Sequence, residues 1–265
     1  MSNIWAIYKR ELSNYFFSPL AYVIYVFFLV VCAVFFNFGF AQYHQLSMQY
    51  IQMMSFQQGA MAQDLPNYTE FVLLGITGVM TFVLLFVIPM LSMRLLSEEK
   101  KLGTFELLMT YPIRDSEVML GKYFAALTVF LGLLVLSLGY GLLSQIIVPD
   151  QTYWPPVLAS YLGVFLVGAS FLAFGMFASS LTENQIVAGL ITFAVLLVLW
   201  MIGFVDQLYP DNILATICDH ISVFAHFERF SQGVIDTADV AYYVLFTVFF
   251  LFFTLRVMES HRWRG

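Results

Sequence analysis

Six apolar runs that contain no Asp, Glu, Lys or Arg recur along the chain. They extend from Leu20 to Phe40, Phe71 to Met93, Tyr123 to Val148, Val157 to Leu181, Ile186 to Val205 and Val240 to Leu255. Most of them reach the roughly 20 residues that a helix needs to cross a bilayer core of about 30 Å. We therefore predict six transmembrane helices, at about 20–40, 71–96, 123–148, 157–181, 186–205 and 240–258, the last ending near an interfacial Arg256.

A shorter amphipathic pattern precedes the first run. Its apolar residues recur at helical spacing, namely Ile4, Trp5, Tyr8, Leu12, Tyr15 and Phe16. The pattern predicts an interfacial helix over residues 4–16, which Ser18 and Pro19 separate from the first span because a residue before proline avoids the helical region. The alternative is a membrane anchor that has no part in coupling.

Two longer segments between spans also carry helical patterns. Within the external segment 42–70, residues 42–63 are rich in glutamine, with apolar residues at helical spacings, which predicts an amphipathic extension of the first span that Pro66 and Asn67 end. Residues 207–238 place apolar side chains at helical intervals after Pro210. We expect one or two short re-entrant or interfacial helices in this second segment.

Composition indicates that the chain lies in a lipid bilayer, and the positions of its charges indicate its orientation across that bilayer. The chain is 61% hydrophobic and 11% charged, with a mean hydropathy of +0.84, whereas soluble domains carry about 25% charged residues. Ten of the 11 basic residues precede the first span, lie between the second and third spans, or follow the sixth. Because basic loops remain in the cytoplasm, both termini and the 94–122 loop are predicted inside, with Arg229 left outside. These features define an all-α polytopic membrane protein with one domain over residues 1–265.

The inside loop, residues 97–122, contains signals for a short helix of its own. Gly103 is a natural end for the preceding helix, Thr104 can cap a new one, and Glu106 suits its first turn. Tyr111 and Pro112 stop it after roughly seven residues, too few for a helix to be stable alone in water. The helix therefore needs a partner surface, unless it packs back onto the ends of the second and third spans.

Several kinds of chemistry are disfavoured by the residues present. Gly121 and Lys122 lack the glycine-rich loop of a nucleotide-binding motif, so an ATPase motor would be another chain. His220 and His226 lie six residues apart, on different faces of a helix, which favours hydrogen bonding over metal binding. The six apolar runs contain no charged residue, whereas ion-coupled carriers usually need such residues in their pathway, and this argues against an ion-coupled carrier. The small-residue pair Gly175 and Ser179 predicts close helix packing in the fourth span.

The loop residues also carry a resemblance to a known family. The acidic pair Glu98-Glu99, Gly103-Thr104, Glu106-Leu107-Leu108 and Pro112 resemble the intracellular segment of ABC-2-type permeases. Together with residues 9–23, 121–125, 175–185 and 226–236, they make almost the whole chain similar to the permease subunit of gliding-motility-associated ABC transporters.

This resemblance implies a permease fold of the ABC-2 (type V exporter-like) kind, in which residues 4–16 form a connecting helix and the loop forms a coupling helix that docks on the ATPase. The implied coupling residues are Glu98, Glu99, Gly103, Thr104, Glu106, Leu107, Leu108 and Pro112. A second, smaller cytoplasmic contact is implied at Thr182, Glu183, Asn184 and Gln185. The chain itself would hold no catalytic residue, metal or cofactor, since ATP and magnesium bind the partner ATPase.

The implied partners are a dimer of ABC ATPase subunits, a second permease subunit that is identical or homologous, a periplasmic or auxiliary membrane subunit and the lipid bilayer, but no nucleic acid. The implied location is the bacterial inner membrane. Two functions follow: a permease subunit of an ATP-driven exporter, or a subunit that transmits ATPase-driven motion to a periplasmic partner through residues 42–70 and 207–238 without transport. An autonomous channel or carrier is disfavoured.

Overall fold

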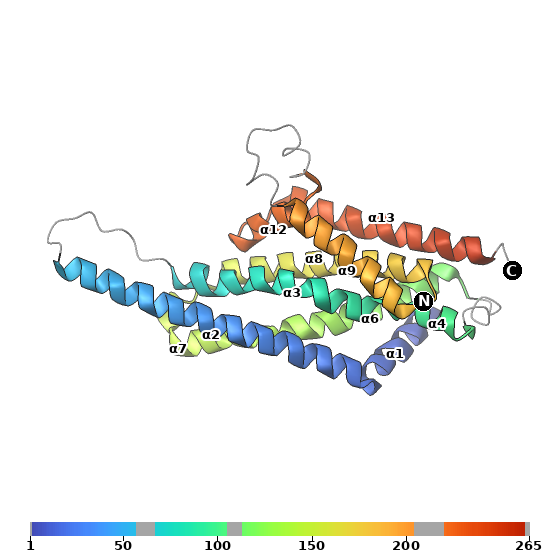
Figure 1. Cartoon of the computed structure of the whole chain (residues 1–265), viewed down its shortest axis with the longest axis horizontal. Helices are drawn as coiled ribbons and strands as arrows, with labels where there is room; N and C mark the ends of the chain where they lie inside the picture. The colour runs from blue at the N-terminus through green and yellow to red at the C-terminus, as the bar shows by residue number, and fades with distance from the viewer. Residues whose placement is uncertain (1, 57–66, 105–112, 204–219, 263–265) are drawn as a thin grey trace.

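The protein folds as an elongated bundle of helices (Figure 1). The computed structural model describes residues 2–56, 67–104, 113–203 and 220–262, and these residues contain no β-strand. The helices are α1 (Ser2–Phe17), α2 (Pro19–Phe56), α3 (Gly75–Ser92), α4 (Ser97–Lys101), α6 (Asp115–Ser137), α7 (Gly139–Ile147), α8 (Trp154–Leu181), α9 (Gln185–Ile202), α12 (Val223–Ser231) and α13 (Thr237–Arg262). A π-helical turn, η1 (Thr69–Leu74), precedes α3, and a 3-10 turn, η2 (Pro149–Gln151), follows α7.

Six stretches are long and apolar enough to cross a membrane, which confirms the predicted number. They are Pro19–Met53, Thr69–Lys101, Asp115–Ile147, Trp154–Leu181, Gln185–Ile202 and Thr237–Ser260. The third begins eight residues before the predicted Tyr123. The Arg114 N–H donates to the Glu117 carboxylate at 3.2 Å, so the first two turns of α6 take up part of the segment expected to be loop.

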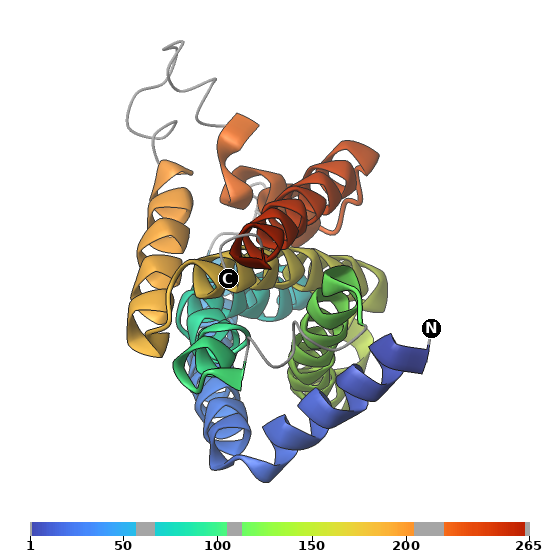
Figure 2. The ribbon, with the colours of Figure 1, turned by 90° about the vertical axis from the view of Figure 1, so that its right-hand side faces the viewer.

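Helix α8 occupies the centre of the bundle (Figure 2). It contacts α3, α6, α9, α12 and α13, and 67% of its most apolar 18-residue stretch is buried. The corresponding buried share is only 11% for α13 and 17% for α9. Helix α8 is therefore, together with the equally buried α3, the core of the chain, whereas α9 and α13 present most of their surface outward.

Small residues let the neighbours of α8 approach closely. A Cβ atom added at Gly175 would lie 2.1 Å from Ser92 Oγ of α3, and one added at Gly168 would lie 2.2 Å from the Phe130 ring of α6. Gly175 and Ser179 thus mark a close helix contact, as their spacing predicts.

Helix α2 is longer than a bilayer requires. Its 38 residues span about 57 Å at 1.5 Å per residue, against a bilayer core of about 30 Å. A narrow stripe of Ile24, Phe28, Cys32 and Phe36 is buried against the bundle. Beyond this stripe the helix continues past its neighbours, as Figure 1 shows, so the predicted extension of the first span is present at least to Phe56.

Helix α1 lies across one end of the bundle, at a large angle to the spans (Figure 2). Its Ile7 side chain reaches Gly121 of α6, and the Tyr8 hydroxyl lies 3.1 Å from Thr128 Oγ1. Trp5 and Phe17 remain 57% and 88% exposed, on a surface suited to a membrane interface. The predicted amphipathic helix and its break at Ser18 are both present.

We name the two ends of the bundle by their short helices. The α4 end holds α1, α4 and the last turns of α13, and the α12 end holds η1, η2 and α12 (Figure 1). Within the described part of residues 207–238, α12 is the short helix that the sequence predicts; residues 207–219 lie outside the described residues.

Candidate functional site

The first four predicted coupling residues lie at the α4 end. Glu98 and Glu99 belong to the single turn of α4, and Gly103 ends it with a φ of +68°, a conformation that glycine adopts without strain. The Thr104 hydroxyl donates to the Glu99 carbonyl at 3.4 Å. The other four, Glu106, Leu107, Leu108 and Pro112, lie outside the described residues, as does the body of the predicted coupling helix.

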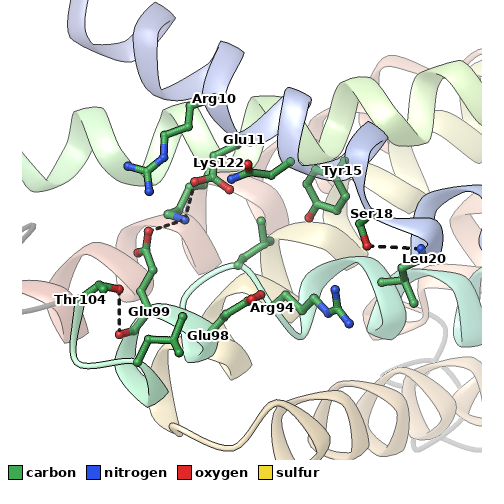
Figure 3. Close-up of a pocket in the computed structure, with 13 residues that line it drawn as sticks. Arg10, Glu11, Tyr15, Ser18, Leu20, Arg94, Glu98, Glu99, Thr104 and Lys122 are labelled. Atoms are coloured by element: carbon green, nitrogen blue, oxygen red, sulfur yellow. Dashed lines mark hydrogen bonds and ion pairs between the residues drawn. The ribbon is translucent and has the colours of Figure 1, made fainter.

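Lys122 links three helices at this end. Its side chain is only 4% exposed, and its ammonium lies 3.0 Å from the Glu11 carboxylate of α1 and 2.9 Å from the Glu99 carboxylate of α4 (Figure 3). A buried charge is tolerated only when it is paired, and here one cation faces two anions. The pairings tie α1, α4 and α6 into one unit, which we call the Lys122 junction.

The Lys122 junction borders a pocket of about 400 Å³. The pocket is lined by charged and polar residues of α1, the α3–α4 turn and α6, as Figure 3 shows, and by three leucines, Leu20, Leu95 and Leu102. Four of these residues are Arg10, Arg94, Glu98 and Thr104. Because both cations and carboxylates line it, the pocket suits a protein segment that carries charged or polar side chains.

Two buried polar groups at the junction have no hydrogen-bond partner among the described residues. These are Arg94 Nε and the second carboxylate oxygen of Glu99. Nearby, the Tyr15 hydroxyl donates to the Leu91 carbonyl at 2.8 Å, and burial raises the pKa of this phenol far above its ordinary value. Tyr15 therefore acts as a neutral donor that holds α1 against the end of α3.

A serine of α8 holds the turn between α3 and α4. Ser179 Oγ accepts hydrogen bonds from the backbone N–H groups of Leu96 and Ser97 at 3.1 and 3.0 Å, and donates to the Met93 carbonyl. The helical hydrogen bonds are interrupted at this turn, so these bonds replace them. The Lys100 ammonium also donates to the Ser180 carbonyl. Helix α4 is thus fastened to the central helix as well as to the Lys122 junction.

The predicted second contact lies beside the same element. Asn184 caps α9 by accepting from the Ile186 N–H at 2.9 Å, and its own N–H donates to Thr182 Oγ1 at 3.1 Å. Helix α4 contacts both α8 and α9, which this turn connects. The two segments predicted from the resemblance therefore meet at one end of the molecule.

Sequence reasoning missed the central residues of the junction. Lys122 served only as a marker of topology, and Glu11 and Ser179 received no role in coupling. A weak signal existed in the position of Lys122, directly before the apolar run that begins at Tyr123, where a charge needs a partner.

The fold defines a polytopic helical membrane protein with a six-span bundle and a polar pocket at its α4 end. Residues 5–255 match the model of the ABC-2 family transporter proteins, so the chain belongs to that family. Members of this family are membrane subunits of transporters in which the ATPase is a separate chain. No curated protein sequence matches this chain.

Proposed function

We propose that this chain is the permease subunit of an ATP-driven exporter, with the α4 end in the cytoplasm against a separate ABC ATPase. The observation that carries the proposal is the Lys122 junction, which connects the segment leading into the predicted coupling helix to both α1 and α6. A force that the ATPase exerts on α4 is thereby transmitted to α1 and α6 and does not only deform the loop.

The charge distribution supports this orientation. Lys9, Arg10 and the basic residues around α4 lie at one end, whereas Arg229 is the sole basic residue of the 207–238 segment at the other. Positively charged short loops remain in the cytoplasm. We place the complex in a bacterial inner membrane, with ATP and magnesium on the ATPase dimer and a second permease subunit beside this one. The resemblance to gliding-motility permeases is part of this proposal.

The test is assembly with the ATPase partner in detergent. Glu106→Lys combined with Leu108→Asp is expected to abolish co-purification of the ATPase and its stimulated ATP hydrolysis, because both changes fall in the predicted coupling helix. The matched control is Glu228→Lys with Val234→Asp, two exposed residues at the α12 end, which should leave assembly intact. If assembly were unchanged in the coupling-helix variant and lost in the control variant, the ATPase would dock at the α12 end, against the proposal.

One observation favours a second function, transmission of motion to an external partner. Beyond Tyr43, which still packs on Tyr68, α2 exposes apolar side chains including Leu46, Met48, Ile51 and Met53, where the helix extends past its neighbours. A single helix of this length is only marginally stable alone in water. Proteoliposomes that hydrolyse ATP without moving any lipid, peptide or small amphiphile would favour transmission, whereas ATP-dependent movement of such a molecule would favour export.

A further inference from the structure

A groove opens at the α12 end, far from the Lys122 junction. It measures about 510 Å³ and lies between η1 and the start of α3 on one side and α12 on the other. Volumes of this size accommodate small organic ligands. We call it the outer groove.

Two glycines keep the α3 wall of the outer groove open. A Cβ atom added at Gly75 or Gly78 would meet no atom within 4 Å, so the space beside them is empty rather than filled by a neighbour. The wall begins with the π-helical turn η1, a local widening that occurs frequently at functional sites. The opening therefore results from the π-helical turn η1 and from the missing side chains at Gly75 and Gly78.

The opposite wall is aromatic. Phe224 and Phe227 of α12 line the groove with ring centroids 6.3 Å apart, and Phe227 is only 1% exposed, so Phe224 is the accessible ring of this wall. Phe224 also lies 6.3 Å from the Trp200 ring of α9, and Trp200 lies 5.2 Å from Phe82 of α3. The aromatic surface thus continues from the groove into the bundle, and it suits an apolar or aromatic body.

Glu70 supplies a negative charge to the outer groove. Among the described residues lining the groove it alone is ionisable, and within the described part of the chain its carboxylate makes no ion pair or hydrogen bond. Arg229 does not neutralise it, because that guanidinium is engaged by Asp236 at 2.7 Å and by Asp239 at 3.0 Å. The groove therefore presents an uncompensated negative charge beside aromatic rings.

The aromatic wall is held before any ligand arrives. His226 Nδ1 of α12 lies 2.7 Å from the buried Asp239 carboxylate of α13, and Ser160 Oγ of α8 donates to the Phe230 carbonyl at 2.8 Å. A Cβ atom at Gly163 would lie 2.5 Å from Phe230, so α12 packs directly on α8. A preformed wall lowers the ordering cost of binding.

We infer that the outer groove binds an amphiphilic organic cation, with its apolar body against Phe224 and its positive charge near Glu70. Both the carboxylate and the ring faces attract a cation. The inference rests on the proposed function, since it gives the exporter a substrate class. It is tested on the permease alone, so a failure of binding is distinct from a failure to couple to an ATPase.

The probe is radiolabelled tetraphenylphosphonium, measured against the full-length chain in nanodiscs, with empty nanodiscs as the lipid blank. Tetraphenylborate has nearly the same shape and the opposite charge. We expect the cation to bind saturably and the anion not to. Glu70→Gln should weaken cation binding about fivefold, as expected for an exposed charge pair, and should abolish the preference over the anion.

Three further variants separate the parts of the site. Gly78→Leu should fill the groove and abolish binding, and Phe224→Leu, which keeps apolar volume, should weaken it without unfolding α12. Glu228→Gln is the matched control, because this carboxylate lies on α12 but does not line the groove. Saturable binding that is equal for both ions, or unchanged in Glu70→Gln, would overturn the inference. So would variants that alter only the oligomeric state, since the groove would then be an interface with a second copy.

Discussion

At the scale of single residues, Lys122 carries the most concentrated electrostatic role. It faces Glu11 and Glu99 from a position that is almost inaccessible to solvent. Removing one partner of a buried ion pair leaves an uncompensated charge, which is far more costly than removing the whole set. This asymmetry gives a sharp test of the junction.

We expect Lys122→Met to lower the free energy of unfolding by about 3–5 kcal/mol, because Glu11 and Glu99 would remain buried and unpaired. Thermal denaturation in detergent measures the effect. Adding Glu11→Gln and Glu99→Gln to the same chain should recover most of the loss. Lys101→Met, at an exposed neighbour of the junction, should be neutral. A melting curve of Lys122→Met identical to that of the native chain would contradict the buried pairing.

Ser179 acts through the backbone rather than through charge. Its hydroxyl is the acceptor for two N–H groups of the α3–α4 turn, and an unsatisfied buried donor costs about 1–3 kcal/mol. We expect Ser179→Ala to speed hydrogen exchange over residues 93–101, measured by mass spectrometry. Ser180→Ala is the control: Ser180 is equally buried, its hydroxyl donates only to the Phe177 carbonyl, and its backbone carbonyl still accepts from Lys100. Equal exchange in both variants would remove Ser179 from its holding role.

At the scale of elements, α8 joins the two ends of the molecule. One end of α8 holds α4 through Ser179, and the other end packs against α12 through Gly163 and Ser160. At 28 residues it spans about 42 Å as a single helix. A displacement of α4 can therefore reach the outer groove without passing through a loop.

Close packing makes α8 sensitive to a single methyl group. We expect Gly175→Ala to destabilise the chain by about 1–3 kcal/mol, because the new Cβ would overlap Ser92 of α3. Gly139→Ala should be neutral or stabilising, since a Cβ there meets nothing within 4 Å and alanine is the better helix former. Both changes are read from melting temperatures in the same detergent, and opposite signs are expected. A stabilising Gly175→Ala would show that α3 and α8 do not approach as described.

At the scale of the whole molecule, the two ends of the bundle are expected on opposite sides of the membrane. In a chain with Cys32 and Cys218 replaced by serine, Lys101→Cys should react with a membrane-impermeant maleimide only after lysis. Glu228→Cys should react in intact spheroplasts, because it lies exposed at the α12 end. The reverse labelling pattern would invert the orientation and with it the proposed position of the ATPase.

Much of the architecture was predictable from the sequence, for a physical reason. A bilayer forces each span to satisfy its backbone internally and to present an apolar surface over a set length, so charge-free runs of about 20 residues identify spans directly. The amphipathic period of residues 4–16 and the helix-ending Gly103 are equally local signals, and both elements are present. The apolar run marks only the part of α6 from Tyr123 onward, because residues 115–122 include charged residues although the helix continues through them from Asp115.

The chain by itself thus determined the number of spans, the terminal amphipathic helix and the side on which its positive charge gathers, because each depends on residues near in sequence. Only the tertiary structure decided that Lys122 meets Glu11 and Glu99, that Ser179 holds α4, and that Glu70 and Phe224 line the same groove. These pairs are separated by 23 to 154 residues along the chain. No local spacing encodes such contacts, because they depend on which helices α8 brings together.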